Sequence, residues 1–335
     1  MAKSPRSRAK APAIPPTSAG SLIAALEFCN VAQRDIGQPH QSHVRLSGGW
    51  AVAYDGILTA ATRIVEDLTC CPHTQRLIDT LKRCKGGMTI AATEHKLKIA
   101  SGGLLAYVPC IAGDLMADSQ PDPVIATIDD RIKQGFDKVM RLASDNAQHV
   151  VTSSILLRAG SMLATDRHVM LEFWHGNDLP PDLVIPKTFA AAVAKTIKPL
   201  ARLGYSPTSV TFWFEDQSWI KTQLYSDPWP KIEIFDGNEY QFSAIPAEFW
   251  EGLAAVAPHC DDSRIHFLKD ALRSHKENEV GAGYLVPGLA EDWCFNPKHL
   301  LQMQGLMTHY DLGFDNGIAY FLGENIRGAC TSVKD

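Results

Sequence analysis

The sequence lacks several features that would mark common classes of protein. No apolar run is long enough to cross a membrane, and the first eighteen residues lack the apolar core of a signal peptide. None of the eight cysteines forms a Cys-x-x-Cys pair or a metal-ligand spacing, and no phosphate-binding loop or Gly-x-Ser-x-Gly motif is present. These absences predict a cytoplasmic protein with reduced thiols, no membrane partner, no cofactor and no metal site.

Charge is unevenly distributed. The net charge is −5 over 335 residues, but the first acidic residue is Glu27, and Lys3, Arg6, Arg8 and Lys10 precede it. Residues 1–19 are rich in proline and small residues, so we expect a disordered basic tail. The remaining chain is acidic, which argues against a protein coated in nucleic acid but leaves room for a basic inner surface.

The chain contains a repeat of about 110 residues. Each copy has an amphipathic helix followed by two alternating strands around a polar turn. The three helices and their turns are Gln75–Cys84 with a turn at Glu94–His95, Pro186–Lys195 with a turn at Asp216–Gln217, and Pro297–Leu306 with a turn at 315–317. A repeat of this length indicates similar domains rather than a solenoid.

A second helix is predicted near the start of each third: Ser21–Gln33, Val124–Ala143 and Ala247–Ala257. Ser21 is the expected cap of the first. The predicted fold class is therefore α+β, with three repeated domains that each pack two helices on an antiparallel sheet. Turn-forming residues place the boundaries so that the domains cover 20–118, 119–236 and 237–335.

Four short motifs follow one another along the chain: Leu163–Met170, which reads LATDRHVM, then Val184–Phe189, Trp229–Phe235 and Phe295–Leu300. They resemble motifs that occur in the same order in the bacterial DNA polymerase III β subunit, the sliding clamp. The first is similar to the Ala-Thr-Asp-Gly-His-Arg-Leu-Ala of that family. The resemblance covers about residues 20 to 335, matches poorly at 260–292, and implies a divergent or phage-encoded clamp built from three DNA-clamp domains.

Asp166 and His168 in the first motif could be an acid–base pair of an enzyme. The alternative is a turn between two strands, because the motif lies between two apolar segments and no other catalytic motif accompanies it. The resemblance favours the second interpretation, since the matching turn of the family lines a groove that binds short client peptides. The groove residues it implies are Thr165, Arg167, His168, Val169, Met170, Pro230, Phe235, His299, Ala329, Thr331 and Val333.

The groove departs from the family pattern at several positions. Arg167 stands in place of glycine, Val169 in place of arginine, and His299 in place of tyrosine, while Thr331 and Ser332 replace Met-Pro. We therefore expect the groove to prefer peptides that differ from those of bacterial clamps. Simple core packing is the alternative for Met170, Pro230 and Phe235.

Basic residues predict a second functional surface. Lys195, Lys198 and Arg202 would share one helical face at i, i+3 and i+7. The ordinary interpretation of such residues is a solvated helix face, whereas in a clamp they would face DNA phosphates. The full predicted set is Arg34, Arg76, Lys82, Arg83, Arg131, Lys138, Arg141, Lys195, Lys198, Arg202 and Lys298.

The resemblance also implies partners and assembly. It predicts a homodimeric ring around duplex DNA, closed near Leu105 and Tyr107 on one side and near Pro258 and His259 on the other. The expected partners are duplex DNA, a DNA polymerase and other clients, and a clamp loader. The protein itself is expected to catalyse no reaction. Two alternatives stay open: a clamp-like protein that binds client peptides without encircling DNA, and a nucleic-acid-processing enzyme, although the acidic residues are scattered.

Overall fold

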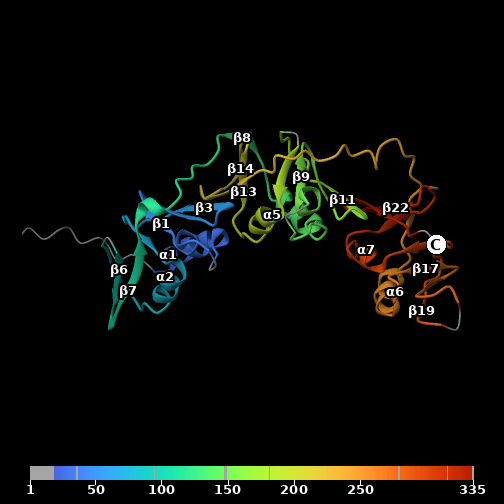
Figure 1. The fold of residues 1–335 in the computed structure, drawn as a ribbon, viewed down its shortest axis with the longest axis horizontal. Helices are drawn as coiled ribbons and strands as arrows, with labels where there is room; N and C mark the ends of the chain where they lie inside the picture. The colour runs from blue at the N-terminus through green and yellow to red at the C-terminus, as the bar shows by residue number, and fades with distance from the viewer. Residues whose placement is uncertain are drawn as a thin grey trace, which may run out of the picture. The chain divides into compact units, whose positions relative to one another are not determined.

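The computed structural model describes residues 19–34, 37–93, 95–146, 149–180, 182–277, 280–314 and 316–333. The chain divides into two compact units (Figure 1). The first contains the residues up to Gln120 together with Gln217–Ile220, and the second contains 121–216 and 221–335. Apart from Ala19, the predicted basic tail lies outside the described residues.

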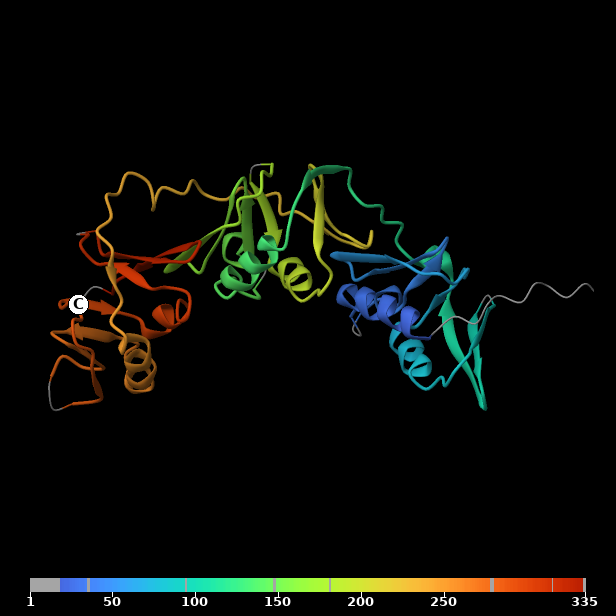
Figure 2. The ribbon, with the colours of Figure 1, turned by 180° about the vertical axis from the view of Figure 1, so that it is seen from behind.

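The first unit packs two helices beside short antiparallel sheets. Helices α1 and α2 contact each other, and α1 also packs on β2 and β3 (Figure 2). The amphipathic pattern of α2 buries Leu77, Ile78 and Leu81. Strands β1, β2 and β3 form one meander, and β4, β7, β6 and β5 lie in that order in a second sheet. The elements are α1 (Ala19–Cys29), η1 (Asn30–Ala32), η2 (Pro39–Ser42), β1 (Arg45–Ser47), β2 (Trp50–Tyr54), β3 (Leu58–Arg63), β4 (Cys71–Pro72), α2 (Thr74–Leu81), β5 (Thr89–Ala92), β6 (Lys96–Ser101), β7 (Leu104–Ile111) and η3 (Gly113–Leu115).

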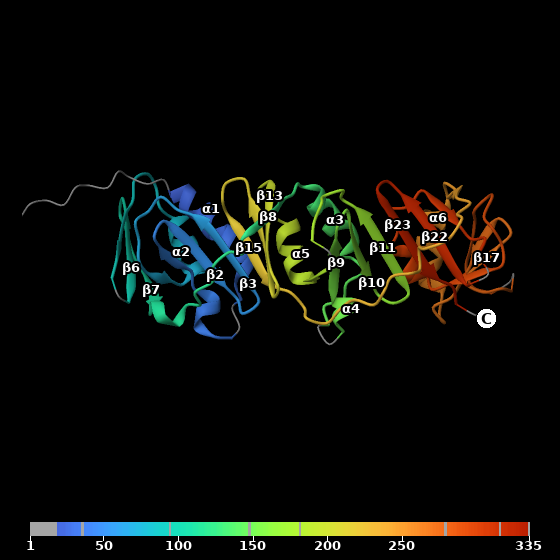
Figure 3. The same cartoon turned by 90° about the horizontal axis from the view of Figure 1, so that it is seen from above.

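The second unit is built on an eight-stranded antiparallel sheet in the order β12-β9-β10-β11-β23-β22-β21-β16. Helices α3 and α5 contact each other and cover one face of its first strands (Figure 3). Gly135 permits this packing, because a Cβ there would lie 2.6 Å from side-chain atoms of Met162 and Phe173. The elements up to the linker are β8 (Val124–Thr127), α3 (Arg131–Val139), α4 (Val150–Ser153), β9 (Ser154–Arg158), β10 (Ser161–Thr165), β11 (Val169–Trp174), β12 (Leu183–Pro186), α5 (Lys187–Ala194), β13 (Leu200–Ser206), β14 (Ser209–Phe214) and β15 (Trp219–Gln223), whose first two residues belong to the first unit.

A linker of residues 224–242 then passes over the other face of this sheet. In Figure 1 it is the gold trace above the strands, whereas α5 and α7 lie below them. The chain ends in two further helices, a four-stranded sheet β19-β18-β17-β20, and the strands that complete the large sheet. These elements are β16 (Ser243–Ala244), α6 (Phe249–Val256), η4 (Ala257–His259), β17 (Ile265–Leu268), β18 (Ala271–Arg273), β19 (Gly283–Leu285), β20 (Trp293–Phe295), α7 (Pro297–Leu301), β21 (His309–Asp311), β22 (Ile318–Gly323) and β23 (Ile326–Thr331).

The predicted α+β class is confirmed, but the predicted starts of two helices were wrong, and the helices predicted to end at Ala143 and Leu306 end at Val139 and Leu301. Residues 124–127 form strand β8 instead of helix, because the β-branched Val124, Ile125 and Thr127 suit pairing with β13, and α3 begins only at Arg131. Ser21 does not cap α1, which already includes Ala19. Among the described residues, no helix combines the length and apolar character needed to span a bilayer.

Candidate functional site

The motif LATDRHVMLEF forms a β-hairpin in the second unit. Strand β10 ends at Thr165 and β11 begins at Val169, and Thr165 lies opposite Met170 in the register. The Asp166 backbone N–H donates to the Val169 carbonyl over 3.2 Å, and the Thr165 hydroxyl donates to the same carbonyl over 2.7 Å. The prediction of a turn between strands is therefore confirmed.

Asp166 uses its carboxylate within this turn. Its Oδ1 accepts from the backbone N–H groups of His168 and Val169 over 2.9 and 2.7 Å, as aspartate commonly does in turns. Arg167 has a φ of 82°, in the left-handed region where glycine is at ease and other residues are strained. The carboxylate thus shapes the backbone of the turn, and Arg167 occupies a backbone conformation that favours glycine.

The turn contacts the end of the chain and helix α7. The imidazole rings of His168 and His299 stack with centroids 4.5 Å apart and an interplanar angle of 15°. Thr331 N–H donates to the His168 carbonyl over 2.9 Å, and Val333 N–H donates to the Cys294 carbonyl over 2.8 Å. Burial lowers the pKa of His299, with nearby Asp166 opposing and His168 reinforcing that shift. Residues far apart in sequence therefore meet at this turn.

Met170 connects two apolar clusters on the linker-covered face of the sheet. One cluster contains Leu156, Leu163 and Val184, and the linker residues Tyr225, Trp229 and Ile232 pack on it. The other contains Phe235, Tyr320 and Ala329, and Met170 and Ile232 pack on both clusters. Met170 stays partly exposed, whereas Val169, Phe235 and Ala329 are buried. Of these four predicted groove residues, Met170 is thus the most exposed.

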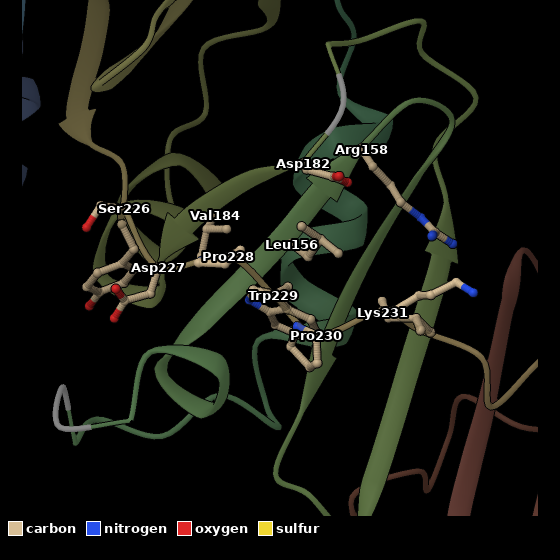
Figure 4. Close-up of a pocket in the computed structure, with 12 residues that line it drawn as sticks. Leu156, Arg158, Asp182, Val184, Ser226, Asp227, Pro228, Trp229, Pro230 and Lys231 are labelled. Carbon is tan, nitrogen blue, oxygen red and sulfur yellow. The ribbon is translucent and has the colours of Figure 1, made fainter.

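A first hollow of about 560 Å³ lies beside the linker (Figure 4). Leu156, Val184, Trp229 and Pro230 contribute apolar surface to it. The Trp229 indole N–H donates to Ser154 Oγ over 3.0 Å, which anchors this part of the linker to the sheet. Arg158 and Lys231 extend toward one side in Figure 4, whereas Asp227 and Ser226 lie at the other. The hollow therefore has an apolar middle between charged ends, and the exposed Pro230 belongs to it.

A second hollow of about 170 Å³ opens farther along the same face, where aromatic residues gather. It is lined by Trp174, Phe235, Tyr240, Phe242, Tyr320, Phe321, Leu322, Arg327 and Gly328. Arg327 lies over the Phe235 ring at 4.1 Å and over the Trp174 ring at 5.2 Å. Phe235 is therefore the one residue of the predicted groove that also lines this hollow.

One buried carboxylate, Glu172, orients an arginine of each hollow. Arg158 Nη2 donates to its Oε1 over 2.5 Å, and Arg327 Nε donates to its Oε2 over 2.7 Å. Ser161 Oγ also donates to Oε1, over 2.7 Å. Burial alone would raise the pKa of Glu172, but the hydrogen bonds and the adjacent guanidinium groups hold it below its usual value. Glu172 thus fixes both arginines as charged donors.

Sequence patterns did not single out Arg158, Glu172, Trp174 or Arg327. The sequence contains part of the information needed to find them, because the alternation along β11 places Glu172 and Trp174 on the same face as Met170. The pairing of β11 with β23, which brings Arg327 opposite Glu172, joins residues 155 positions apart. No local pattern contains that information.

The predicted shared helical face of Lys195, Lys198 and Arg202 is wrong. Helix α5 ends at Ala194, and Arg202 lies in β13, where its guanidinium is 5.3 Å from the centre of the Trp213 ring. Pro199 follows Lys198 and disfavours continued helix at that point. Lys198 forms an ion pair with Asp216 at 2.7 Å.

The other predicted DNA-facing cations have varied surroundings. Arg131 and Lys138 do lie on α3, seven residues apart, whereas Arg141 follows the helix and donates to the Gln302 and Gln304 carbonyls. Four of the others are exposed on or next to helices α2 and α7: Arg76, Lys82, Arg83 and Lys298. Arg34, Lys82 and Arg131 form ion pairs with Asp55, Glu27 and Asp129 respectively.

The predicted assembly residues are exposed within their own units. On β7, Leu105 is 56 % exposed and Tyr107 is 53 % exposed, and both point to the same face of their sheet. Pro258 and His259 are exposed in η4, directly after α6. Exposed apolar side chains on a strand are suited to a protein contact.

Comparison with known proteins shows the fold to which this geometry belongs. No family model and no curated protein matches the sequence. Solved structures do match: the DNA polymerase III β chain of Streptococcus pneumoniae, at a TM-score of 0.80 and 11 % identity, covers 95 % of this chain and 98 % of its own. This chain has the fold of a bacterial sliding clamp. The DNA polymerase III β subunit of Pseudomonas aeruginosa matches with a TM-score of 0.78 and 14 % identity over 94 % of this chain and 98 % of its own.

A third match of the clamp fold carries a ligand. The Helicobacter pylori β clamp bound to a DNA ligase peptide is similar with a TM-score of 0.74 and 13 % identity, over 94 % of this chain and 98 % of that one. Among the side chains that the structure describes, no group of three histidine, cysteine or acidic residues is placed to hold a metal ion.

Proposed function

We propose that the protein is a DNA sliding clamp, a processivity factor that encircles duplex DNA as a homodimer and tethers a DNA polymerase and other clients. The observation that carries the proposal is the clamp fold over about 95 % of the chain. Its three domains would be residues 20–118, 119–236 and 237–335, so that two chains supply a six-domain ring. A head-to-tail contact from Leu105 and Tyr107 to Pro258 and His259 would close it.

Clients would bind at the hairpin turn and the linker. Met170 supplies partly exposed apolar surface there, and His168, His299 and Thr331 would form the polar wall around the turn, with Thr165 and Val333 supporting it from within and beside the turn. The peptide-bound Helicobacter pylori clamp supports this use of the fold. Because Arg167 and His299 change the wall, we expect the preferred peptides to differ from those of bacterial clamps.

Duplex DNA would be held by cations on helices and by topology. Arg76 and Arg83 are exposed at helix α2, and Lys and Arg side chains attract phosphates irrespective of sequence. Tight contact is unnecessary when a closed ring encloses the duplex. This function requires no chemistry, so we propose that the protein is not an enzyme.

The test is retention on DNA. The protein is loaded on nicked circular plasmid with the clamp loader of its host and separated from free protein by gel filtration. We expect it to remain on the circle and to leave within minutes when a restriction enzyme linearises the plasmid. Equal retention on circular and linear DNA would contradict encirclement, and peptide binding without retention would indicate a client-binding protein that does not encircle DNA.

A matched pair of variants tests the DNA surface. Arg76→Glu and, separately, Arg83→Glu should each lower the loaded fraction and flatten its dependence on salt, since a lost phosphate contact reduces the slope by about one. Lys231→Glu is the control, because Lys231 is 84 % exposed but lies on the linker. Equal loss in the control would show a general effect of charge instead of a DNA-facing helix.

A further inference from the structure

The second hollow has the size and lining of a site for one side chain. Its volume is about 170 Å³, below the roughly 300 to 1,000 Å³ typical of sites for small molecules and cofactors. Trp174 is 38 % exposed at its edge, and Phe235, Tyr240 and Phe242 bring aromatic surface from the linker. An aromatic or aliphatic side chain of a partner would bury apolar area here.

Arg327 gives the hollow a preference for negative charge. It is the single charged residue among the described residues that line the hollow, and its side chain is 24 % exposed. Its partner Glu172 is shared with Arg158, so that one carboxylate faces two guanidinium groups and one positive charge remains. Hydrogen bonds to Glu172 and stacking on two rings hold Arg327 in place, and a donor fixed in this way loses little conformational freedom on binding.

We infer that this hollow is a second peptide-binding site, which takes an aromatic side chain with an acidic residue beside it from a partner protein. The aromatic ring enters among Trp174, Phe235 and Phe242, and the neighbouring carboxylate pairs with Arg327. The site lies beyond the hairpin turn at which the client groove is proposed, and it requires neither a closed ring nor DNA. Its occupant would therefore be bound whether or not the protein encircles DNA.

The probe is the hexapeptide Gly-Ser-Phe-Asp-Ser-Gly with fluorescein at its N-terminus and an amidated C-terminus. Fluorescence anisotropy should show saturable binding to the full-length protein. Replacing the peptide's Phe by Ala, or its Asp by Asn, should each weaken binding by about tenfold. If both altered peptides bind as well as the parent, the site is refuted.

Variants of the protein locate the binding. Trp174→Ala and, separately, Phe242→Ala should each weaken binding by about tenfold, because each removes part of the aromatic wall. Trp50→Ala is the matched control, since Trp50 is also stacked by an arginine, Arg63 at 4.1 Å, but lies on β2. Circular dichroism verifies that each variant is folded. Unchanged binding in both wall variants, or equal loss in the Trp50 variant, would overturn the inference.

Discussion

Replacing Glu172 by glutamine should destabilise the second unit more than any comparable change at an exposed glutamate. Glutamine keeps the shape of the side chain but removes the charge that two arginines share. Glu172 is 1 % exposed, and the Arg158 and Arg327 side chains are 34 % and 24 % exposed. Without the carboxylate, two partly desolvated guanidinium groups would face each other with a neutral amide between them.

The expected loss of unfolding free energy follows from the burial of Glu172, Arg158 and Arg327. Breaking a buried ion pair by removing one partner costs about 3–5 kcal/mol of unfolding free energy. The partial exposure of both arginines places this case at about 3 kcal/mol, the lower end of that range. For a unit of this size that corresponds to a fall of about 6–12 °C in its melting temperature.

The pH dependence provides an independent check. The pKa of Glu172 is lower in the folded protein than its value of 4.5 in an unfolded chain. Its contribution to stability is therefore complete above pH 4.5 and is lost as the pH falls from 4.5 through the folded pKa. In the glutamine variant this part of the acid sensitivity should disappear.

Urea denaturation followed by circular dichroism at pH 7, and at steps below pH 4.5, measures both effects. Glu233→Gln is the control, because Glu233 is 65 % exposed and pairs with the exposed Lys231 over 2.6 Å. We expect little change in the control. If Glu172→Gln costs no more than the control, the shared carboxylate does not organise the two hollows.

Three further predictions concern the hairpin turn and its neighbours. Met170→Ala should weaken binding of a polymerase-derived client peptide by about 1–3 kcal/mol in calorimetry. Asp166→Asn can still accept hydrogen bonds in the turn and should have a much smaller effect on peptide binding. The reverse order of the two effects would contradict the groove. Arg167→Gly should raise the unfolding free energy by up to about 1 kcal/mol in urea titrations, because it relieves a φ of 82°, and a clear loss of stability would show that the arginine side chain matters more than backbone strain. His299→Tyr should reduce the loss of thermal stability on acidification below pH 6.5. Burial lowers the pKa of His299, so the unfolded chain takes up the proton at a higher pH than the folded protein. Identical profiles of melting temperature against pH for the variant and the parent would refute this.

Local chemistry decided the features that the sequence alone predicted. The apolar positions of α2 and the polar turn between β10 and β11 could be identified because helix and strand periodicities and turn residues act within a few positions. Order and spacing of the motifs then indicated the clamp fold, which the solved structures match over nearly the whole chain. The hairpin at 161–174 is the clearest example, since its sequence specifies both its strands and its turn.

Local patterns failed where two structures compete over a short segment. Val124–Thr127 was predicted as helix, yet pairing with β13, about 75 residues away in sequence, makes it a strand. Lys195, Lys198 and Arg202 have helical spacing, but the helix ends at Ala194 and the chain enters β13. In the first case a strand distant in sequence determined the outcome, whereas in the second case Pro199 was a local signal against helix that the spacing of the cations obscured.

The sequence by itself was sufficient for the hairpin, for the central turns of most helices and for the resemblance to the clamp fold, because the first two depend on neighbouring residues and the third on a recognisable order of motifs. The tertiary structure alone placed Arg158 and Arg327 on the two sides of Glu172 and the linker aromatics over Trp174. The physical reason is that strand pairing joins residues 155 positions apart, and the buried Glu172 carboxylate can form its ion pairs only when the sheet has brought the arginines next to it.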